Sequence, residues 1–264
     1  MNRNIITSSL MFMSLGIAHA EPFDNLAKAL ASPERVTSLS INESEPDSNM
    51  KHLPPKLGTL VKLKELEISC LENLEDIPVE IGQLKKLEKI VIDNGNGCGM
   101  NVSIPASIGD LTNLKVLRLF GALDPGESES SVPATTPKIK PLPATIAKLQ
   151  NLEELDLGRN HLQTIPPEIS NLKNLKKLGL DYNNLHDIPS FIGELKNLRE
   201  LSISSNGGIK LPQSLSKLSG LRISMGNNYL KLKDQAELRR QFPGATFDFE
   251  NEYDDVAANE ESPK

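Results

Sequence analysis

The chain has 264 residues, of which 38% are apolar and none is tryptophan, and its formal net charge at pH 7 is -6. An acidic chain with mixed charges gives no electrostatic reason to expect nucleic acid or an anionic membrane surface as a partner. The low apolar fraction argues against a globular enzyme and favours a thin array of repeats, each of which buries a narrow apolar stripe.

The first residues, 1–20, predict a secretory signal peptide. Arg3 precedes an apolar stretch from Ile5 to Ile17, and the small-residue step Ala18-His19-Ala20 is typical of a cleavage site. The alternative for this segment is a buried N-terminal helix. No other apolar run approaches the roughly 18 residues of a membrane span, and no cysteine follows the cleavage step. We therefore expect a secreted, periplasmic or cell-surface protein without a lipid anchor or a membrane span.

Residues 21–35 predict an N-terminal cap. Leu26 and Leu30 share one helical face, and Ser32-Pro33 ends the helical pattern. A repeat array needs such a cap, because its first repeat would otherwise expose the apolar core.

An internal repeat dominates residues 36–230. The clearest unit starts at Leu152 with the pattern L-x-x-L-x-L-x-x-N-x-L, and it recurs at Leu175 and Leu198, each time after 23 residues. The fourth and sixth residues of the unit alternate as in a short strand with one buried face. No single unit can bury its leucines alone, so the units must stack.

Two further features of the unit have a structural explanation. The asparagine side chain can bond to backbone groups of the turn that follows the strand, and stacked units repeat this bond. Each unit then has proline after an isoleucine or leucine, which fixes φ where the chain starts its return. The asparagines are Asn160, Asn183 and Asn206, and the prolines are Pro166, Pro189 and Pro212.

Weaker copies extend the array in both directions. They begin at Val36, Leu63, Leu87 and Leu114, and a shortened copy contains Ile223, which gives eight strand positions. Residues 231–250 predict a C-terminal cap with a helix and a last strand. The acidic residues 251–264 predict a disordered tail, because they contain few apolar side chains.

These motifs resemble the 23-residue leucine-rich repeats of bacterial secreted and surface proteins. The segment 26–36 and the step Phe242-Pro243-Gly244 are similar to the two ends of the leptospiral-type leucine-rich-repeat family. The resemblance implies an α/β fold: a curved leucine-rich-repeat solenoid of about eight repeats with parallel strands on the concave face and irregular or short helical segments on the convex side. It also implies binding of proteins or cell-surface ligands, sometimes from a host, without naming the partner.

Two units are longer than the others. The excess in the unit at Leu114 lies in residues 121–141, and the unit at Leu87 has a glycine-rich loop around Cys98. Insertions in solenoids form loops that often flank a binding face, although a tolerated surface loop explains them as well. In an exported protein, Cys70 and Cys98 are a possible disulfide; two free thiols are the alternative.

The exposed strand positions carry mostly alternating charges, which predicts ion-paired ladders between neighbouring units. A few of these positions, and the turns beside the insertion, carry apolar, aromatic or arginine side chains instead. Such residues anchor protein interfaces, although scattered exposed apolar residues are also common. The predicted partner-binding residues are Val91, Val116, Arg118, Phe120, Arg159 and Tyr182.

We find no motif for catalysis, phosphate binding or metal binding. Asp156 and Asp181 share one face, but two carboxylates are too few for a convincing metal site. We therefore expect that the protein is not an enzyme and that it binds neither a cofactor nor a metal. The sequence predicts protein–protein interaction through the concave face, with a host or envelope protein as the partner. A carbohydrate or surface-polymer binder and an envelope scaffold without a dedicated ligand are the alternatives.

Overall fold

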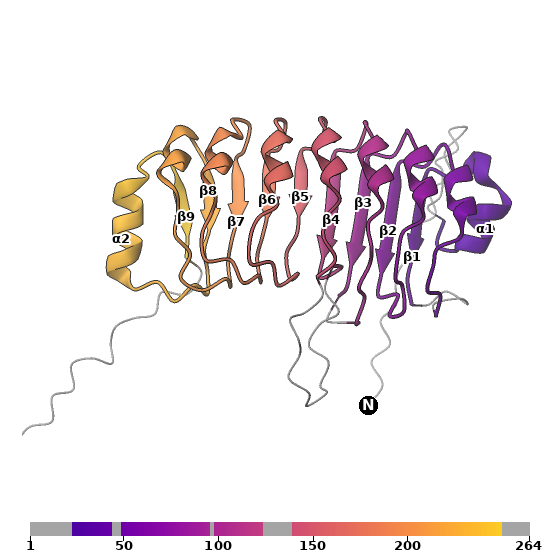
Figure 1. The fold of residues 1–264 in the computed structure, drawn as a ribbon, viewed down its shortest axis with the longest axis horizontal. Helices are drawn as coiled ribbons and strands as arrows, with labels where there is room; N and C mark the ends of the chain where they lie inside the picture. Colours follow the sequence, from indigo (N-terminus) through magenta and orange to yellow (C-terminus); the bar gives the residue numbers. More distant parts are fainter. Residues whose placement is uncertain (1–22, 44–48, 96–97, 124–138, 250–264) are drawn as a thin grey trace, which may run out of the picture.

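A computed structural model describes residues 23–43, 49–95, 98–123 and 139–249 (Figure 1). The expected signal peptide, the acidic tail at 251–264 and most of the insertion at 121–141 lie outside these residues.

The strands form one parallel sheet in which the spatial order follows the chain order (Figure 1). This topology confirms the predicted solenoid, because each strand pairs with the strand of the next repeat. The strands are β1 Ser38–Ile41, β2 Glu65–Ser69, β3 Lys89–Asp93, β4 Val116–Phe120, β5 Glu154–Asp156, β6 Lys177–Gly179, β7 Glu200–Ser202, β8 Arg222–Ser224 and β9 Thr246–Asp248.

The core is a stack of leucine and isoleucine columns behind the sheet. Leu117 lies opposite Ile90 on one side and Leu155 on the other, and all three are buried. The intervening residues point away from the core. We call this outer surface of the sheet the strand face.

A row of short 3₁₀ turns returns the chain after each of the strands β1 to β7 and runs along the top of Figure 1. Proline precedes the first residue of every turn from η2 onward, as at Pro166, Pro189 and Pro212, which confirms its expected place in the return path. The turns are η1 Pro33–Arg35, η2 Pro55–Thr59, η3 Val79–Gln83, η4 Ala106–Asp110, η5 Ala144–Lys148, η6 Pro167–Asn171, η7 Ser190–Glu194 and η8 Gln213–Lys217.

The asparagines of the repeat form a buried column beside the carboxyl ends of the strands. The Asn183 Nδ2 group donates to the carbonyl oxygens of Leu157 and Leu180, at 3.0 and 2.9 Å. Its Oδ1 accepts from the backbone N–H groups of Asn160 and Leu162. Each asparagine therefore joins two coils through backbone groups that would otherwise be buried without partners.

A second asparagine column, which the sequence analysis did not identify, lies just before the strands. In each case Nδ2 donates to a backbone carbonyl oxygen of the preceding coil at 2.7–2.9 Å. This column contains Asn113, Asn151, Asn174 and Asn197.

Helices cover the two ends of the described sheet (Figure 1). Helix α1 (Leu26–Ala31) begins after Asn25, whose side chain accepts a hydrogen bond from the Lys28 N–H group. Helix α2 (Leu232–Gln241) places Arg239 over the ring of Phe249, 4.9 Å from its centroid. Among the described residues, no helix has both the length and the apolar character that a membrane span requires.

Candidate functional site

Strands β3 and β4 present a mixed apolar and charged surface in the middle of the strand face. Val91 lies opposite Arg118, and Phe120 lies opposite Asp93. Val116 lies between Lys89 and Glu154 of the neighbouring strands. Four of the predicted binding residues therefore come together here, and we call them the strand-face patch: Val91, Val116, Arg118 and Phe120.

The ring of Phe120 lies against the backbone of Gly158 in the next coil. A Cβ atom at Gly158 would lie 2.8 Å from both Cδ2 and Cε2 of the ring. Phe120 and the two valines are half-buried, so the patch is more recessed than isolated exposed side chains would be. Because Gly158 has no side chain, the ring of Phe120 can lie against the backbone of the next coil.

Arg118 supplies the positive charge of the patch. Its Nε group donates to Glu154 Oε1, and 46% of its side chain is exposed. The hydrogen bond to Glu154 is the main reason that the pKa of Arg118 lies above its ordinary value. The guanidinium therefore stays charged, and its remaining N–H groups can donate to a partner.

Asp156 lies beside the patch in a recessed position. Its Oδ1 accepts from the Gly158 N–H group at 2.9 Å and lies 2.8 Å from the place a Cβ would take at Gly179. Burial is the largest cause that raises the pKa of Asp156, and the negative charge of Asp181 raises it further.

Asp181 is held within its own surroundings. Its carboxylate accepts from Ser202 Oγ at 2.6 and 2.7 Å and from the Ser204 N–H group at 2.6 Å. Within the part of the chain that the structure describes, no group of three or more possible metal ligands comes together. Asp156 and Asp181 are therefore polar features of the strand face without the third ligand that a metal site would need.

Arg159 and Tyr182 do not lie on the strand face. They occupy the turns that follow β5 and β6, with φ values of 57° and 54°. Arg159 is half-buried, and its Nη1 group donates to the carbonyl oxygen of Gly95 at 2.9 Å. Tyr182 is 56% exposed. These are the turns in which the repeat register predicts both residues, at the carboxyl ends of β5 and β6.

Ion pairs between neighbouring coils flank the patch, as the alternating charges predict. Lys115 contacts Glu88, and Lys176 contacts Glu153, each at 2.7 Å. The hydrogen bond from Lys115 is the main reason that the pKa of Glu88 lies below its ordinary value. The two opposite charges within each pair neutralise each other. The strand-face patch is the part of this surface where apolar side chains lie between such pairs.

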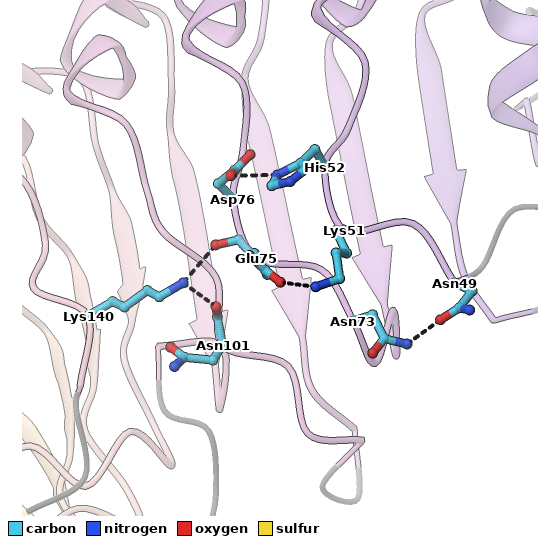
Figure 2. Close-up of polar contacts among 8 residues, drawn as sticks. All are labelled: Asn49, Lys51, His52, Asn73, Glu75, Asp76, Asn101 and Lys140. Atoms are coloured by element: carbon cyan, nitrogen blue, oxygen red, sulfur yellow. Dashed lines mark hydrogen bonds and ion pairs between the residues drawn. The ribbon is translucent and has the colours of Figure 1, made fainter.

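The C-terminal end of the insertion forms hydrogen bonds with earlier coils, which the sequence did not indicate. Lys140 Nζ donates to the carbonyl oxygens of Glu75 and Asn101, at 2.8 and 2.7 Å (Figure 2). Lys51 and His52 pair with Glu75 and Asp76 in the same region (Figure 2). The second end of the insertion thus has a fixed position relative to the coils of β2 and β3.

A cavity of about 520 Å³ lies where the insertion rejoins the array. Its wall combines residues from both ends of the insertion with the coils that follow β5 and β6. It is lined by Leu123, Ile139, Lys140, Pro141, Leu142, His161, Leu162, Gln163, Thr164, Pro166, Glu168 and Asn184.

Cys70 and Cys98 form a disulfide in the structure, with their Cα atoms 5.3 Å apart. Cys70 lies in the turn after β2, and Cys98 lies in the glycine-rich loop after β3. Gly95 lies against this bridge, because a Cβ there would be 2.8 Å from the Cys70 sulfur. The bridge therefore ties the enlarged loop to the preceding coil, at the carboxyl ends of the strands.

A family model described as "Leucine-rich repeat region" matches residues 133–237. The Arabidopsis receptor kinase HAESA, solved with the peptide hormone IDA and a co-receptor, is similar at 27% identity over 77% of this chain and 32% of that chain, with a TM-score of 0.55. Two Listeria monocytogenes proteins are also similar. The internalin InlF gives 16% identity over 88% of this chain and 72% of its own, with a TM-score of 0.51. InlP gives 22% identity over 73% and 49%, with a TM-score of 0.50. No curated protein sequence gave a significant match.

Proposed function

We propose that this leucine-rich-repeat solenoid is a binding module, not an enzyme, and that it recognises a protein partner on the strand-face patch. The observation that carries the proposal is the recessed apolar group Val91, Val116 and Phe120 around the charged Arg118. Aromatic and arginine side chains in such a setting are the usual energetic centres of protein interfaces. The surrounding ion pairs supply a polar rim.

The solved relative HAESA supports a protein or peptide partner in general, because its title describes a complex with a peptide hormone and a co-receptor. It does not specify the partner of this chain, which covers about a third of that protein.

We further propose that the chain is exported and meets its partner outside the cytoplasm, as a host or envelope protein. The signal-peptide pattern in residues 1–20 supports export. The disulfide between Cys70 and Cys98 also supports it, because disulfides persist in oxidising compartments.

Affinity capture with the mature chain tests the proposal. We expect a protein captured by the wild type to be lost with the double variant Val116→Ser and Phe120→Ala. The matched control is Val79→Ser, because Val79 is 65% exposed but lies on η3, away from the strand face. Equal capture by all three proteins would exclude the strand-face patch.

A further inference from the structure

We propose that the turns after β6, β7 and β8 form a binding site for a neutral oligosaccharide. The site is separate from the strand-face patch and lies along the border of the sheet that the carboxyl ends of the strands form. We call it the tyrosine edge, and its residues are Tyr182, Asn184, Ser205, Gly207, Gly208, Asn227 and Tyr229.

Two tyrosines are the most prominent features of this edge. Tyr182 is 56% exposed and Tyr229 is 77% exposed. They belong to coils two strands apart, which corresponds to about 10 Å at the usual spacing of parallel strands. Tyrosine offers an apolar ring face together with a hydroxyl group that donates and accepts hydrogen bonds.

The turn between the two tyrosines, residues 204–208, contains only serine, asparagine and glycine. Gly207 and Gly208 lie in this turn, and a Cβ built on either would have no other atom within 4 Å. An open shelf of backbone therefore separates the rings, and an extended ligand can approach it closely.

The turn backbones are held by the buried asparagine column. Asn228 Oδ1 accepts from the backbone N–H groups of Asn206 and Gly207, at 2.7 and 3.0 Å. The Tyr182 N–H group donates to Ser204 O at 2.9 Å. A surface that is ordered before binding loses less conformational entropy when a ligand binds.

Turn geometry alone does not require Tyr182. Its φ is 54°, and left-handed backbone favours glycine or asparagine over a bulky residue. The matching turn positions carry Gly121 after β4, Arg159 after β5, Ser205 after β7 and Asn227 after β8, with φ values of 63°, 57°, 55° and 56°. Tyr229 has a φ of 56° as well. The backbone at these positions accepts residues of different sizes, so it does not by itself account for the two large exposed rings.

The chemistry of the edge matches an uncharged sugar polymer. The turn segments 182–185, 204–209 and 226–230 contain no charged residue, in a chain in which 24% of residues are charged. A neutral oligosaccharide presents C–H faces to aromatic rings and hydroxyls to amide and hydroxyl groups, and it needs no counter-charge. An acidic polysaccharide or a phosphate would need cations that these turns do not contain.

The test is direct binding of the mature chain to an array of neutral hexose and N-acetylhexosamine oligosaccharides, with uronic-acid oligosaccharides beside them. The best neutral ligand is then titrated by calorimetry. We expect binding to neutral members only, and a loss of affinity of about tenfold or more for Tyr182→Asn and for Tyr229→Asn. Both variants should keep the wild-type melting temperature or exceed it, because asparagine tolerates this backbone.

Phe120→Ala is the matched control, since it removes an aromatic ring from the strand-face patch and should leave sugar binding unchanged. Three results would overturn the proposal: no neutral oligosaccharide bound, equal binding of the acidic ones, or full affinity in both tyrosine variants. A failure of protein capture by the strand-face patch is a separate result, because its variants lie on a different surface.

Discussion

The backbone N–H group of Asn160 donates a hydrogen bond of 3.1 Å to the side-chain oxygen of Asn183 in the next coil. Asn206 and Asn228 repeat the bond two coils later, at 2.7 Å. These side chains are buried, so the column links successive coils inside the molecule, where water cannot replace a missing partner.

Replacement of Asn183 by alanine should therefore be costly. The substitution leaves the carbonyl groups of Leu157 and Leu180 and two N–H groups without their side-chain partner. We expect the free energy of unfolding to fall by about 2–4 kcal/mol, measured by urea denaturation. Asn184→Ala is the control, because Asn184 is exposed; an equal loss for both variants would show that the column does not stabilise the fold.

Gly193 should not tolerate a methyl group. A Cβ at this residue would clash with the carbonyl oxygen of Ser214 in the next coil. We expect Gly193→Ala to destabilise the protein by about 1–3 kcal/mol through overpacking. Gly244→Ala, where a Cβ would meet no atom within 4 Å, should change the stability little, and thermal unfolding of the two variants compares them directly.

At neutral pH, the wild-type protein with an ionised Asp156 should be less stable than a variant with asparagine at this position. Its folded-state pKa is raised, chiefly by burial. The folded protein therefore holds the proton more tightly than the unfolded chain, so stability falls as the pH rises from the ordinary value of 3.8 through the folded pKa.

Asp156→Asn removes this charge while its Oδ1 can still accept from the Gly158 N–H group. The variant should be more stable than the wild type at neutral pH, and the difference should shrink below pH 3.8. Urea denaturation at both pH values measures it. A difference that does not change with pH would assign the effect to packing instead of ionisation.

The disulfide should contribute measurably to stability. It closes a loop with a sequence separation of 28 residues, for which the chain-entropy model gives about 3.6 kcal/mol. Peptide mapping without reductant should recover Cys70 joined to Cys98. Cys70→Ser with Cys98→Ser should lower the free energy of unfolding by that order. Recovery of both cysteines as free thiols would exclude the bridge in the isolated protein.

The sequence predicted the repeated part of the fold because local geometry determines it. The leucine or isoleucine at alternate strand positions must face inward, and residues equivalent to Asn160 and Pro166 repeat the same hydrogen-bonding and steric roles in other copies. The same register placed Val116 and Phe120 on one surface.

Features that depend on departures from the repeat could not be predicted. The contacts of Lys140 with Glu75 and Asn101 depend on the path of an insertion that has no register. The hydrogen bond from Arg159 to the carbonyl oxygen of Gly95 depends on the enlarged glycine-rich loop, which departs from the 23-residue spacing in the same way.

Site-specific photocrosslinking tests the central claim most directly. A photoreactive amino acid replaces Val116 on the strand face or, as a control, Val79 on η3. Val79 is a suitable control because it is also a valine and is 65% exposed. The mature chain is then irradiated in its native extracellular or envelope setting, and the crosslinked proteins are identified by mass spectrometry. A binding module of the proposed kind gives a defined protein adduct from position 116 that is absent from position 79. The same set of adducts from both positions, or none from position 116, would contradict it.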